Sequence, residues 1–292
     1  MSSNPTIHIG YHKTGTTFLQ QSVFQAHPRL ECWDLLREHR AVRGIATAHD
    51  FDFDPASYQS LRPRSDLPWV ISWEGFVGDP LSGAQTNLRT AERLARVWSG
   101  ARILITLRSQ RTIWTSLYRQ YVAEGGTCNV SRFAALDASN RVFMAEPYFR
   151  YFELVERYRA LFGKERVHVG LYEQLLSTPG TLIAQYLKFI GASPLDVHFE
   201  TRANPSLKGP ALQALRMANH FLRSPLHPGG AVPVENRRAR RFLASLSAAA
   251  ESRSSRETDG FGRGPWSRKV CEGNRRLERD LGLPLASNGY PV

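Results

Sequence analysis

Short β-rich runs alternate with helix-like segments through the first 190 residues, and this alternation constrains the fold more than any other feature of the chain. Strands that alternate with helices form βαβ units, in which the strands run parallel and helices cover both faces of the sheet. The sequence therefore predicts an α/β protein with three layers around a central parallel sheet. We expect strands at residues 6–10, 69–73, 102–107 and 166–171, and helices at residues 17–26, 86–98, 111–124, 147–162 and 178–190.

A glycine- and threonine-rich loop follows the first strand, in the stretch TIHIGYHKTGTTF. Gly10 and Gly15 have the spacing of a triphosphate-binding loop, but Thr16 occupies the position where that loop requires lysine. The lysine of this stretch, Lys13, lies two residues before Gly15 instead. A loop that opens a helix directs backbone N–H groups and the helix dipole at one point, so we expect its ligand to be an anion.

The position of Lys13 favours a 5′-phosphosulfate over a triphosphate as the ligand. In a triphosphate site, the lysine after the second glycine reaches the β and γ phosphates, and a hydroxyl group binds Mg²⁺. Lys13 would instead reach the bridging or leaving oxygen from the side, where one cation stabilises the departing phosphate. Gly15 allows the backbone to approach the ligand closely, and Thr14, Thr16 and Thr17 add hydroxyl donors.

Two motifs resemble the cofactor-binding elements of sulfotransferases that use 3′-phosphoadenosine 5′-phosphosulfate (PAPS). HKTGTTFLQ is similar to their 5′-phosphosulfate loop. In RILITLRSQRTIWTSLYRQY, Arg108 ends a strand eight residues before the helical Ser116, as in their 3′-phosphate-binding element. The resemblance implies a P-loop-like fold, PAPS as co-substrate, PAP as product and no required metal. It also implies cofactor contacts from His12, Lys13, Thr14, Gly15, Thr16, Thr17, Arg108 and Ser116.

A glutamate just beyond another strand is the candidate base. Sulfuryl transfer to a hydroxyl requires removal of the acceptor proton as the oxygen attacks sulfur in line with the departing phosphate. Glu74, in VISWEGF, follows the predicted strand at 69–73 in a largely apolar stretch. Sulfotransferases of the heparan sulfate type resemble this arrangement, which implies that Glu74 is the catalytic base and Lys13 the catalytic cation. His12 is the alternative base, because histidine has that role in cytosolic aryl and alcohol sulfotransferases.

The carboxyl-terminal part of the chain is basic. Residues 202–279 contain sixteen Lys or Arg against six Asp or Glu, and the net charge of the whole chain is +12. The stretch FGRGPWSRK loosely resembles a loop that closes over the nucleotide in the family, which implies cofactor contacts from Gly262, Arg263 and Gly264. The pattern of residues 274–285 predicts an amphipathic terminal helix.

The chain is expected to form a single sulfotransferase domain over residues 1–292. Its core covers residues 1–200, and residues 201–292 form a helical basic part with the cofactor-covering loop. Residues 30–66, with a DFDFD run and an RPRSD turn, are expected to form an insertion that shapes an acceptor cleft.

Two other functions compete with sulfuryl transfer. A P-loop kinase-like phosphotransferase with a relocated lysine is the alternative enzyme, weakened by the missing Gly-Lys-Ser/Thr end of the loop. A nucleic-acid binder would explain the basic charge, but the sequence has no zinc finger and no interleaved aromatic pattern. We therefore expect a small-molecule or glycan acceptor whose hydroxyl belongs to a glycan, a glycolipid or a natural product. Homodimer formation stays open.

No apolar run reaches the length of about 18 residues that a membrane-spanning helix needs, and no secretory signal precedes the first strand. We therefore expect a cytoplasmic protein without a transmembrane segment. The three cysteines, Cys32, Cys128 and Cys271, are odd in number and far apart in sequence. This spacing is typical of reduced thiols rather than of disulfides or a metal site.

Overall fold

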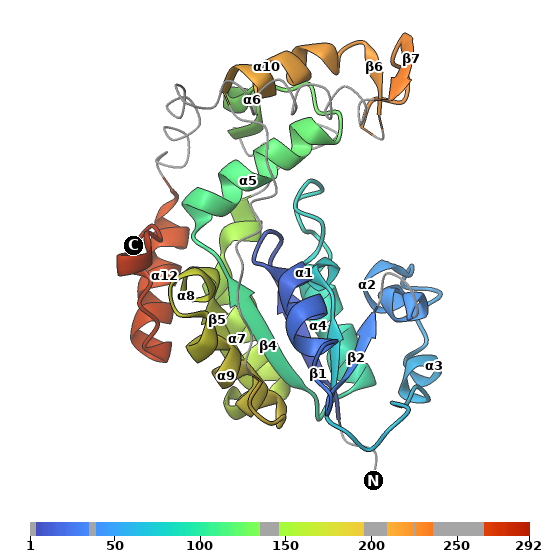
Figure 1. Cartoon of the computed structure of the whole chain (residues 1–292), viewed down its shortest axis with the longest axis vertical. Helices are drawn as coiled ribbons and strands as arrows, with labels where there is room; N and C mark the ends of the chain where they lie inside the picture. Colours follow the sequence, from blue (N-terminus) through green and yellow to red (C-terminus); the bar gives the residue numbers. More distant parts are fainter. Residues whose placement is uncertain (1–3, 35–38, 135–145, 196–208, 225, 236–265) are drawn as a thin grey trace.

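The computed structural model describes residues 4–34, 39–134, 146–195, 209–224, 226–235 and 266–292. Five parallel strands form one sheet in the order β2-β3-β1-β4-β5, with helices on both sides (Figure 1). The four predicted strands and the parallel sheet are confirmed. The strands are β1 (Thr6–Gly10), β2 (Glu31–Asp34), β3 (Trp69–Ser72), β4 (Arg102–Leu107) and β5 (Val167–Leu171).

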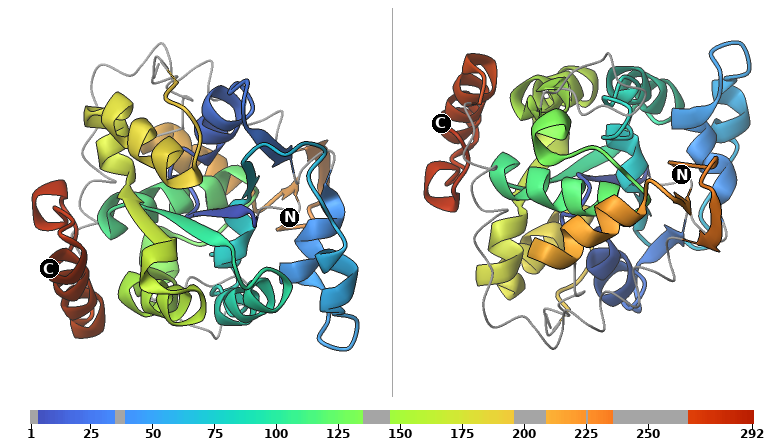
Figure 2. Two further views of the ribbon diagram at one scale, coloured as in Figure 1. Left: turned by 90° about the horizontal axis from the view of Figure 1, so that it is seen from below. Right: turned by 90° about the horizontal axis from the view of Figure 1, so that it is seen from above.

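The edge strand β2 is missing from the sequence-based prediction, which placed residues 30–66 in an insertion. β2 pairs in parallel with β3, with Glu31 opposite Trp69 and Cys32 opposite Val70. It has only four residues, too few for a clear alternation of apolar and polar side chains. The rest of the segment folds beside β2 as η2 (Arg40–Arg43), α2 (Gly44–Thr47) and α3 (Pro55–Gln59). Figure 2 shows α2 and α3 on the side of the molecule opposite to the terminal helix α12 (Arg268–Leu281).

Side chains of the inner strands alternate between two hydrophobic cores, one on each face of the sheet. On one face, Ile103 and Ile105 of β4 belong to the same core as α4 (Asn87–Val97) and α7 (Tyr151–Phe162). On the other face, Leu104 packs with the π-helix η1 (Leu19–Phe24) and with α9 (Pro179–Ile190). Because successive residues of a strand point to opposite faces, this alternation builds the predicted three layers.

Several helix boundaries differ from the prediction. The expected helix at 17–26 is a short α1 (Thr16–Phe18) that continues as the π-helix η1. The expected helix at 147–162 is divided into η4 (Glu146–Phe149) and α7. The terminal helix α12 begins earlier than predicted, because the Ser267 hydroxyl accepts a hydrogen bond from the Val270 N–H and caps its first turn. It ends at Gly282, whose φ of 65° stops the helix.

A long helix connects the sheet with the outer part of the molecule. α5 (Gln110–Ala123) begins directly after β4 and extends toward α10 (Gly209–Ala218), β6 (Leu222–Arg223) and β7 (Val232–Glu235) (Figure 1). The aromatic rings of α5 are buried against Phe133 of α6 (Val130–Ala134), so they fill the core. Within the described residues, no helix is both long and apolar enough to cross a membrane.

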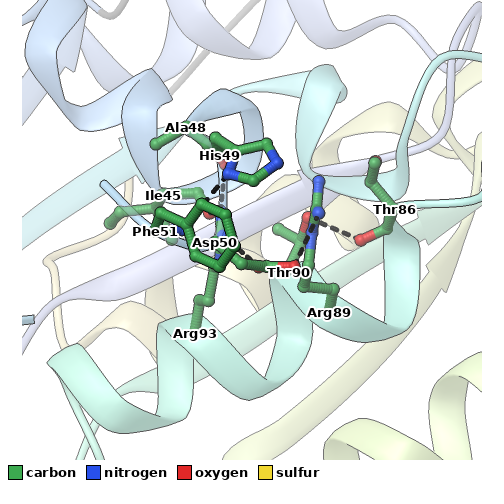
Figure 3. Close-up of polar contacts among 9 residues, drawn as sticks. All are labelled: Ile45, Ala48, His49, Asp50, Phe51, Thr86, Arg89, Thr90 and Arg93. Carbon is green, nitrogen blue, oxygen red and sulfur yellow. Dashed lines mark hydrogen bonds and ion pairs between the residues drawn. The ribbon is translucent and has the colours of Figure 1, made fainter. Parts of the chain in front are cut away.

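One buried arginine holds the segment after β2 against the body of the protein (Figure 3). The Arg93 side chain, on α4, is 3% exposed and donates to the Ile45 carbonyl at 3.1 Å and the Ala48 carbonyl at 2.8 Å. It also pairs with the Asp50 carboxylate, and its guanidinium carbon lies 4.4 Å from the Phe53 ring centre. Arg93 therefore satisfies carbonyls at the end of α2 that would otherwise lack donors.

We expect Arg93→Met to lower the free energy of unfolding by about 3 kcal/mol, because the change leaves buried carbonyls unpaired and removes a mostly buried ion-pair partner. Arg89→Met is the matched control, since Arg89 pairs with the same carboxylate at 3.3 Å from a more exposed position. The control is expected to cost less than about 1 kcal/mol. Urea unfolding measures both values, and equal losses in the two variants would contradict this role of Arg93.

Candidate active site

The carboxyl ends of β3, β1 and β4 meet at one edge of the sheet. Two backbone bonds continue the pairing past the strands: Tyr11 N–H donates to the Thr106 carbonyl at 3.1 Å, and Trp73 N–H donates to the His8 carbonyl at 3.3 Å. The segments that follow these strands start with Tyr11, Trp73 and Arg108, so they share this edge. In parallel sheets ligands bind at this edge, as expected for the loop, Glu74 and Arg108.

The loop after β1 has the conformation of an anion cradle. Lys13 and Gly15 both have positive φ, 66° and 76°, and such a torsion is uncommon for a residue with a side chain. The first backbone hydrogen bond of the helix runs from Leu19 N–H to the Gly15 carbonyl at 3.0 Å. The N–H groups of the turn before Leu19 therefore have no partner within the helix and can bind an anion. The Lys13 side chain is exposed beside them.

The threonines of the loop have different roles from one another. The buried Thr14 hydroxyl donates to the Tyr11 carbonyl at 2.6 Å, so it shapes the loop. The Thr16 hydroxyl donates to Glu74 Oε2 at 3.0 Å, and the Thr17 side chain is exposed. Two of the three hydroxyls expected to serve as ligand donors, those of Thr14 and Thr16, thus donate within the protein instead.

Arg108 lies directly beside the loop. Its Nη1 donates to the Lys13 carbonyl at 2.7 Å, and its Nε donates to Thr112 Oγ1 at 3.0 Å. Its guanidinium carbon is 4.6 Å from the ring centre of Tyr172. The sequence interpretation missed Thr112 and Tyr172. Thr112 is four residues after Arg108, at the start of α5, so the helical spacing could have predicted this contact. Tyr172 follows the end of β5 at the same edge of the sheet, so its position after a strand could also have been recognised.

Glu74 is the first residue of η3 (Glu74–Val77), and only Trp73 separates it from β3. The hydrogen bond from Thr16 fixes its carboxylate against the loop. The Trp73 ring covers Gly75, where an added Cβ would meet Trp73 Cζ2 at 2.4 Å, and the guanidinium carbon of Arg43 lies 5.4 Å from the centre of that ring. Glu74 therefore contacts the loop through Thr16, while its neighbour Trp73 contacts the segment after β2.

The chain matches the family model described as "Sulfotransferase domain" over residues 4–219, well over half of its length. It belongs to the sulfotransferase family. No curated protein matches the chain significantly.

One solved structure supports this assignment at the level of the fold. A sulfotransferase from Alicyclobacillus acidocaldarius is 19% identical, with a TM-score of 0.53 over 74% of this chain and 94% of that one. The sulfotransferase domain from the curacin biosynthetic pathway is 14% identical, with a TM-score of 0.44 over 97% of this chain and 99% of that one. A mouse sulfotransferase complexed with PAP is 10% identical, with a TM-score of 0.39 over 98% of this chain and 86% of that one.

His12, within the loop of this sulfotransferase, lies against the buried Tyr148. Its Nδ1 lies 3.3 Å from the hydroxyl of Tyr148, which is fully buried. Burial lowers the pKa of His12 from its ordinary value, while the charges of Glu74 and Asp79 oppose that shift. Asp79 was not among the predicted site residues. The imidazole is therefore neutral at pH 7, able to donate or accept a hydrogen bond.

Of the remaining predicted cofactor residues, Ser116 lies within the described part of the chain. Ser116 lies one helical turn beyond Thr112 on α5, and within the described residues its hydroxyl bonds neither to the loop nor to Arg108. Gly262, Arg263 and Gly264 lie outside the described residues. In the described part of the chain, no group of three or more His, Cys, Asp or Glu side chains could hold a metal ion.

A buried polar network supports the strands beneath the loop. His8 Nδ1 lies 2.8 Å from Ser72 Oγ, and His8 Nε2 lies 3.1 Å from Thr106 Oγ1, so the ring bridges β3 and β4. Tyr186 and Gln20 extend the network, bonding Thr106 Oγ1 at 3.0 Å and Ser72 Oγ at 3.1 Å. Burial lowers the pKa of His8 from 6.5 to about 3. The imidazole therefore stays neutral, with one nitrogen donating and the other accepting.

This network predicts a loss of stability in mild acid. The folded pKa of His8 is depressed, so its contribution is complete above pH 6.5 and is lost as the pH falls from 6.5 toward 3. Between pH 7 and pH 5 this one group should remove about 2 kcal/mol from the free energy of unfolding. Urea unfolding of the wild type and of His8→Gln at both pH values tests this, because other groups cancel in the comparison. The same pH dependence in both proteins would contradict the prediction.

Proposed function

We propose that this sulfotransferase transfers the sulfuryl group of PAPS to an acceptor hydroxyl. The observation that supports this most strongly is the hydrogen bond from Arg108 Nη1 to the Lys13 carbonyl at 2.7 Å. It ties the anion-binding loop after β1 to the arginine at the end of β4. A cofactor with separate 5′ and 3′ phosphates needs two such anion sites at a fixed spacing, whereas a nucleoside triphosphate needs one continuous cradle.

The residues of the loop fit the 5′ side of PAPS. The backbone N–H groups before Leu19 have no helical partner, and Gly15 has the positive φ that turns the loop toward them. PAPS, when bound, supplies an activated sulfuryl group attached to a phosphate leaving group. In our proposal Lys13 stabilises the charge that develops on the leaving phosphate oxygen, and its backbone carbonyl accepts a hydrogen bond from Arg108.

Glu74 takes the acceptor proton in this mechanism. Its carboxylate lies at the same sheet edge as Lys13, and the Thr16 hydroxyl holds one of its oxygens, so the other can accept a proton. Attack by the acceptor oxygen is in line with the departing phosphate, with Glu74 and Lys13 acting at the two ends of the reacting bonds. The neutral His12 is proposed as a cofactor contact, and it is the alternative base.

We further propose that no metal ion is required. Lys13 alone supplies the positive charge at the leaving phosphate oxygen, where a triphosphate site combines lysine with Mg²⁺. Ser116, Gly262, Arg263 and Gly264 complete the proposed set of cofactor residues. The proposed acceptor is a hydroxyl of a glycan, a glycolipid or a natural product. The segment after β2, whose Arg43 lies against the ring of Trp73, is proposed to form part of the acceptor side.

A turnover screen tests the proposal. The protein is incubated with PAPS and with acceptors from four classes, namely glycans, phenols, tyrosyl peptides and glycopeptides, in buffer containing EDTA. We expect equal amounts of PAP and of sulfated product with at least one hydroxyl acceptor. Phosphate transfer from Mg-ATP to an acceptor, together with no PAPS turnover, would support the kinase-like alternative and contradict the proposal.

A further inference from the structure

The chain after α12 returns to the turn that carries Arg108. The Ser109 hydroxyl donates to the Gly289 carbonyl at 2.8 Å, and the Tyr290 hydroxyl donates to Glu173 Oε2 at 3.1 Å. Tyr290 is buried, with 2% of its surface exposed. The family match ends at residue 219, so this contact with the cofactor side of the molecule comes from outside the matched region.

Glu173 links that segment to the backbone beside Arg108. Its Oε1 accepts the Ser109 N–H at 2.9 Å, while its Oε2 accepts the Tyr290 hydroxyl. Burial raises the pKa of Glu173, and the hydrogen bonds from Ser109 and Tyr290 oppose that shift. The Tyr151 hydroxyl donates to the Arg108 carbonyl at 2.8 Å. The backbone of the turn is therefore held from α7, from the start of α8 (Tyr172–Ser177) and from the terminal segment.

The terminal segment is itself anchored at the start of α5. Gln110 and Asn274 exchange two side-chain amide hydrogen bonds, of 3.0 and 3.2 Å. Asn274 Nδ2 also donates to the Pro291 carbonyl at 2.7 Å. All three bonds are buried, and through them α12 holds residues 289–291 against the turn between β4 and α5.

We propose that Tyr290 and Gly289 form a latch that positions Arg108, through Glu173 and Ser109, for the 3′-phosphate of the adenosine cofactor. The inference rests on the proposed function, which gives Arg108 that phosphate. A guanidinium group binds a phosphate through two parallel hydrogen bonds. The affinity of Arg108 for the 3′-phosphate therefore depends on how firmly the Arg108 backbone is held in the orientation that allows both bonds. Tyr290 is therefore a positioning residue for recognition of the 3′-phosphate.

The latch predicts a loss of selectivity for the 3′-phosphate. PAP and 5′-AMP share the adenosine and the 5′-phosphate, and AMP lacks the 3′-phosphate. Removal of the Tyr290 hydroxyl in Tyr290→Phe should weaken PAP binding about tenfold, the size expected for one hydrogen bond to a charged group acting on a positioned arginine. AMP binding should change less than about twofold, because the loop after β1 is untouched.

Isothermal titration calorimetry with PAP and with AMP, in EDTA, gives the ratio of the two dissociation constants. Tyr158→Phe is the matched control, because it also removes a buried tyrosine hydroxyl, one that has no hydrogen-bond partner within the described residues. The control should leave the ratio unchanged. A purely structural role of Tyr290 would weaken PAP and AMP binding equally or change neither, and either result overturns the inference.

Ser109→Ala is the second variant, and it decides the question if Tyr290→Phe does not fold. It removes the bond to Gly289 and keeps the Ser109 N–H that Glu173 accepts. The ratio should again fall, and an unchanged ratio in the folded variant would overturn the latch. Equal affinity of the wild type for PAP and AMP is a different result, because it would contradict the assignment of Arg108 and hence the proposed function itself.

Discussion

Lys13→Met is expected to lower kcat for sulfuryl transfer by about two to three orders of magnitude, the cost of removing one group that stabilises transition-state charge. Methionine keeps the unbranched stem of the side chain and removes its charge. The positive φ of residue 13 is equally unfavourable for lysine and methionine, so the backbone should not gain or lose strain. The measurement is steady-state turnover of PAPS with the best acceptor from the screen.

The effect of Lys13→Met should fall mainly on kcat. Because lysine acts where charge develops, PAP affinity should fall by a smaller factor than kcat. Lys164→Met is the control, since Lys164 is an exposed lysine in η5 (Lys164–Arg166), just before β5 and away from the carboxyl edge of the sheet. A variant at position 13 with normal kcat and weaker PAP binding would show that Lys13 binds the cofactor without assisting the chemical step.

Glu74→Gln is expected to lower kcat by about a thousandfold, within the range for loss of a general base. Glutamine keeps the size of the side chain, and its carbonyl oxygen can still accept the Thr16 hydroxyl, so the fold and PAP binding should be retained. Turnover and PAP affinity are measured on the same preparation.

Two control variants separate the candidate bases. Asp79→Asn removes the other carboxylate whose charge acts on His12, and His12→Gln removes the alternative base. We expect Asp79→Asn to keep most of its activity and His12→Gln to lose less than Glu74→Gln. Near-normal turnover by Glu74→Gln on the best acceptor would remove Glu74 from the mechanism.

The sheet and the loop could be predicted from the sequence because both depend on local patterns. β1 and β4 have the predicted bounds, since each is an apolar run of strand-forming residues ended by a glycine or an arginine. Once the strands are known to be parallel, their carboxyl ends must share one edge. That rule alone brings Lys13, Glu74 and Arg108 together, and the bonds from Thr16 to Glu74 and from Arg108 to Lys13 agree with it.

The features that the sequence did not predict depend on contacts between distant residues. β2 is identified as a strand only by its pairing with β3. The burial of Arg93 could not be predicted, because its partner Asp50 is 43 residues away in sequence. The bond between Tyr290 and Glu173 joins residues 117 positions apart, and no local pattern marks either partner. Tyrosine and glutamate are common on protein surfaces, so their burial at this turn required the three-dimensional structure.

The measurement that tests the central claim most directly is thermal unfolding of the protein with PAP in EDTA and, separately, with Mg-ATP. A ligand that binds the folded state at a hundred times its dissociation constant adds about 2.7 kcal/mol of stability. The account predicts that PAP raises the unfolding temperature without metal, and that Mg-ATP in EDTA-free buffer gives little or no protection. Strong protection by Mg-ATP together with none by PAP would contradict it, because the loop around Lys13 would then hold a triphosphate.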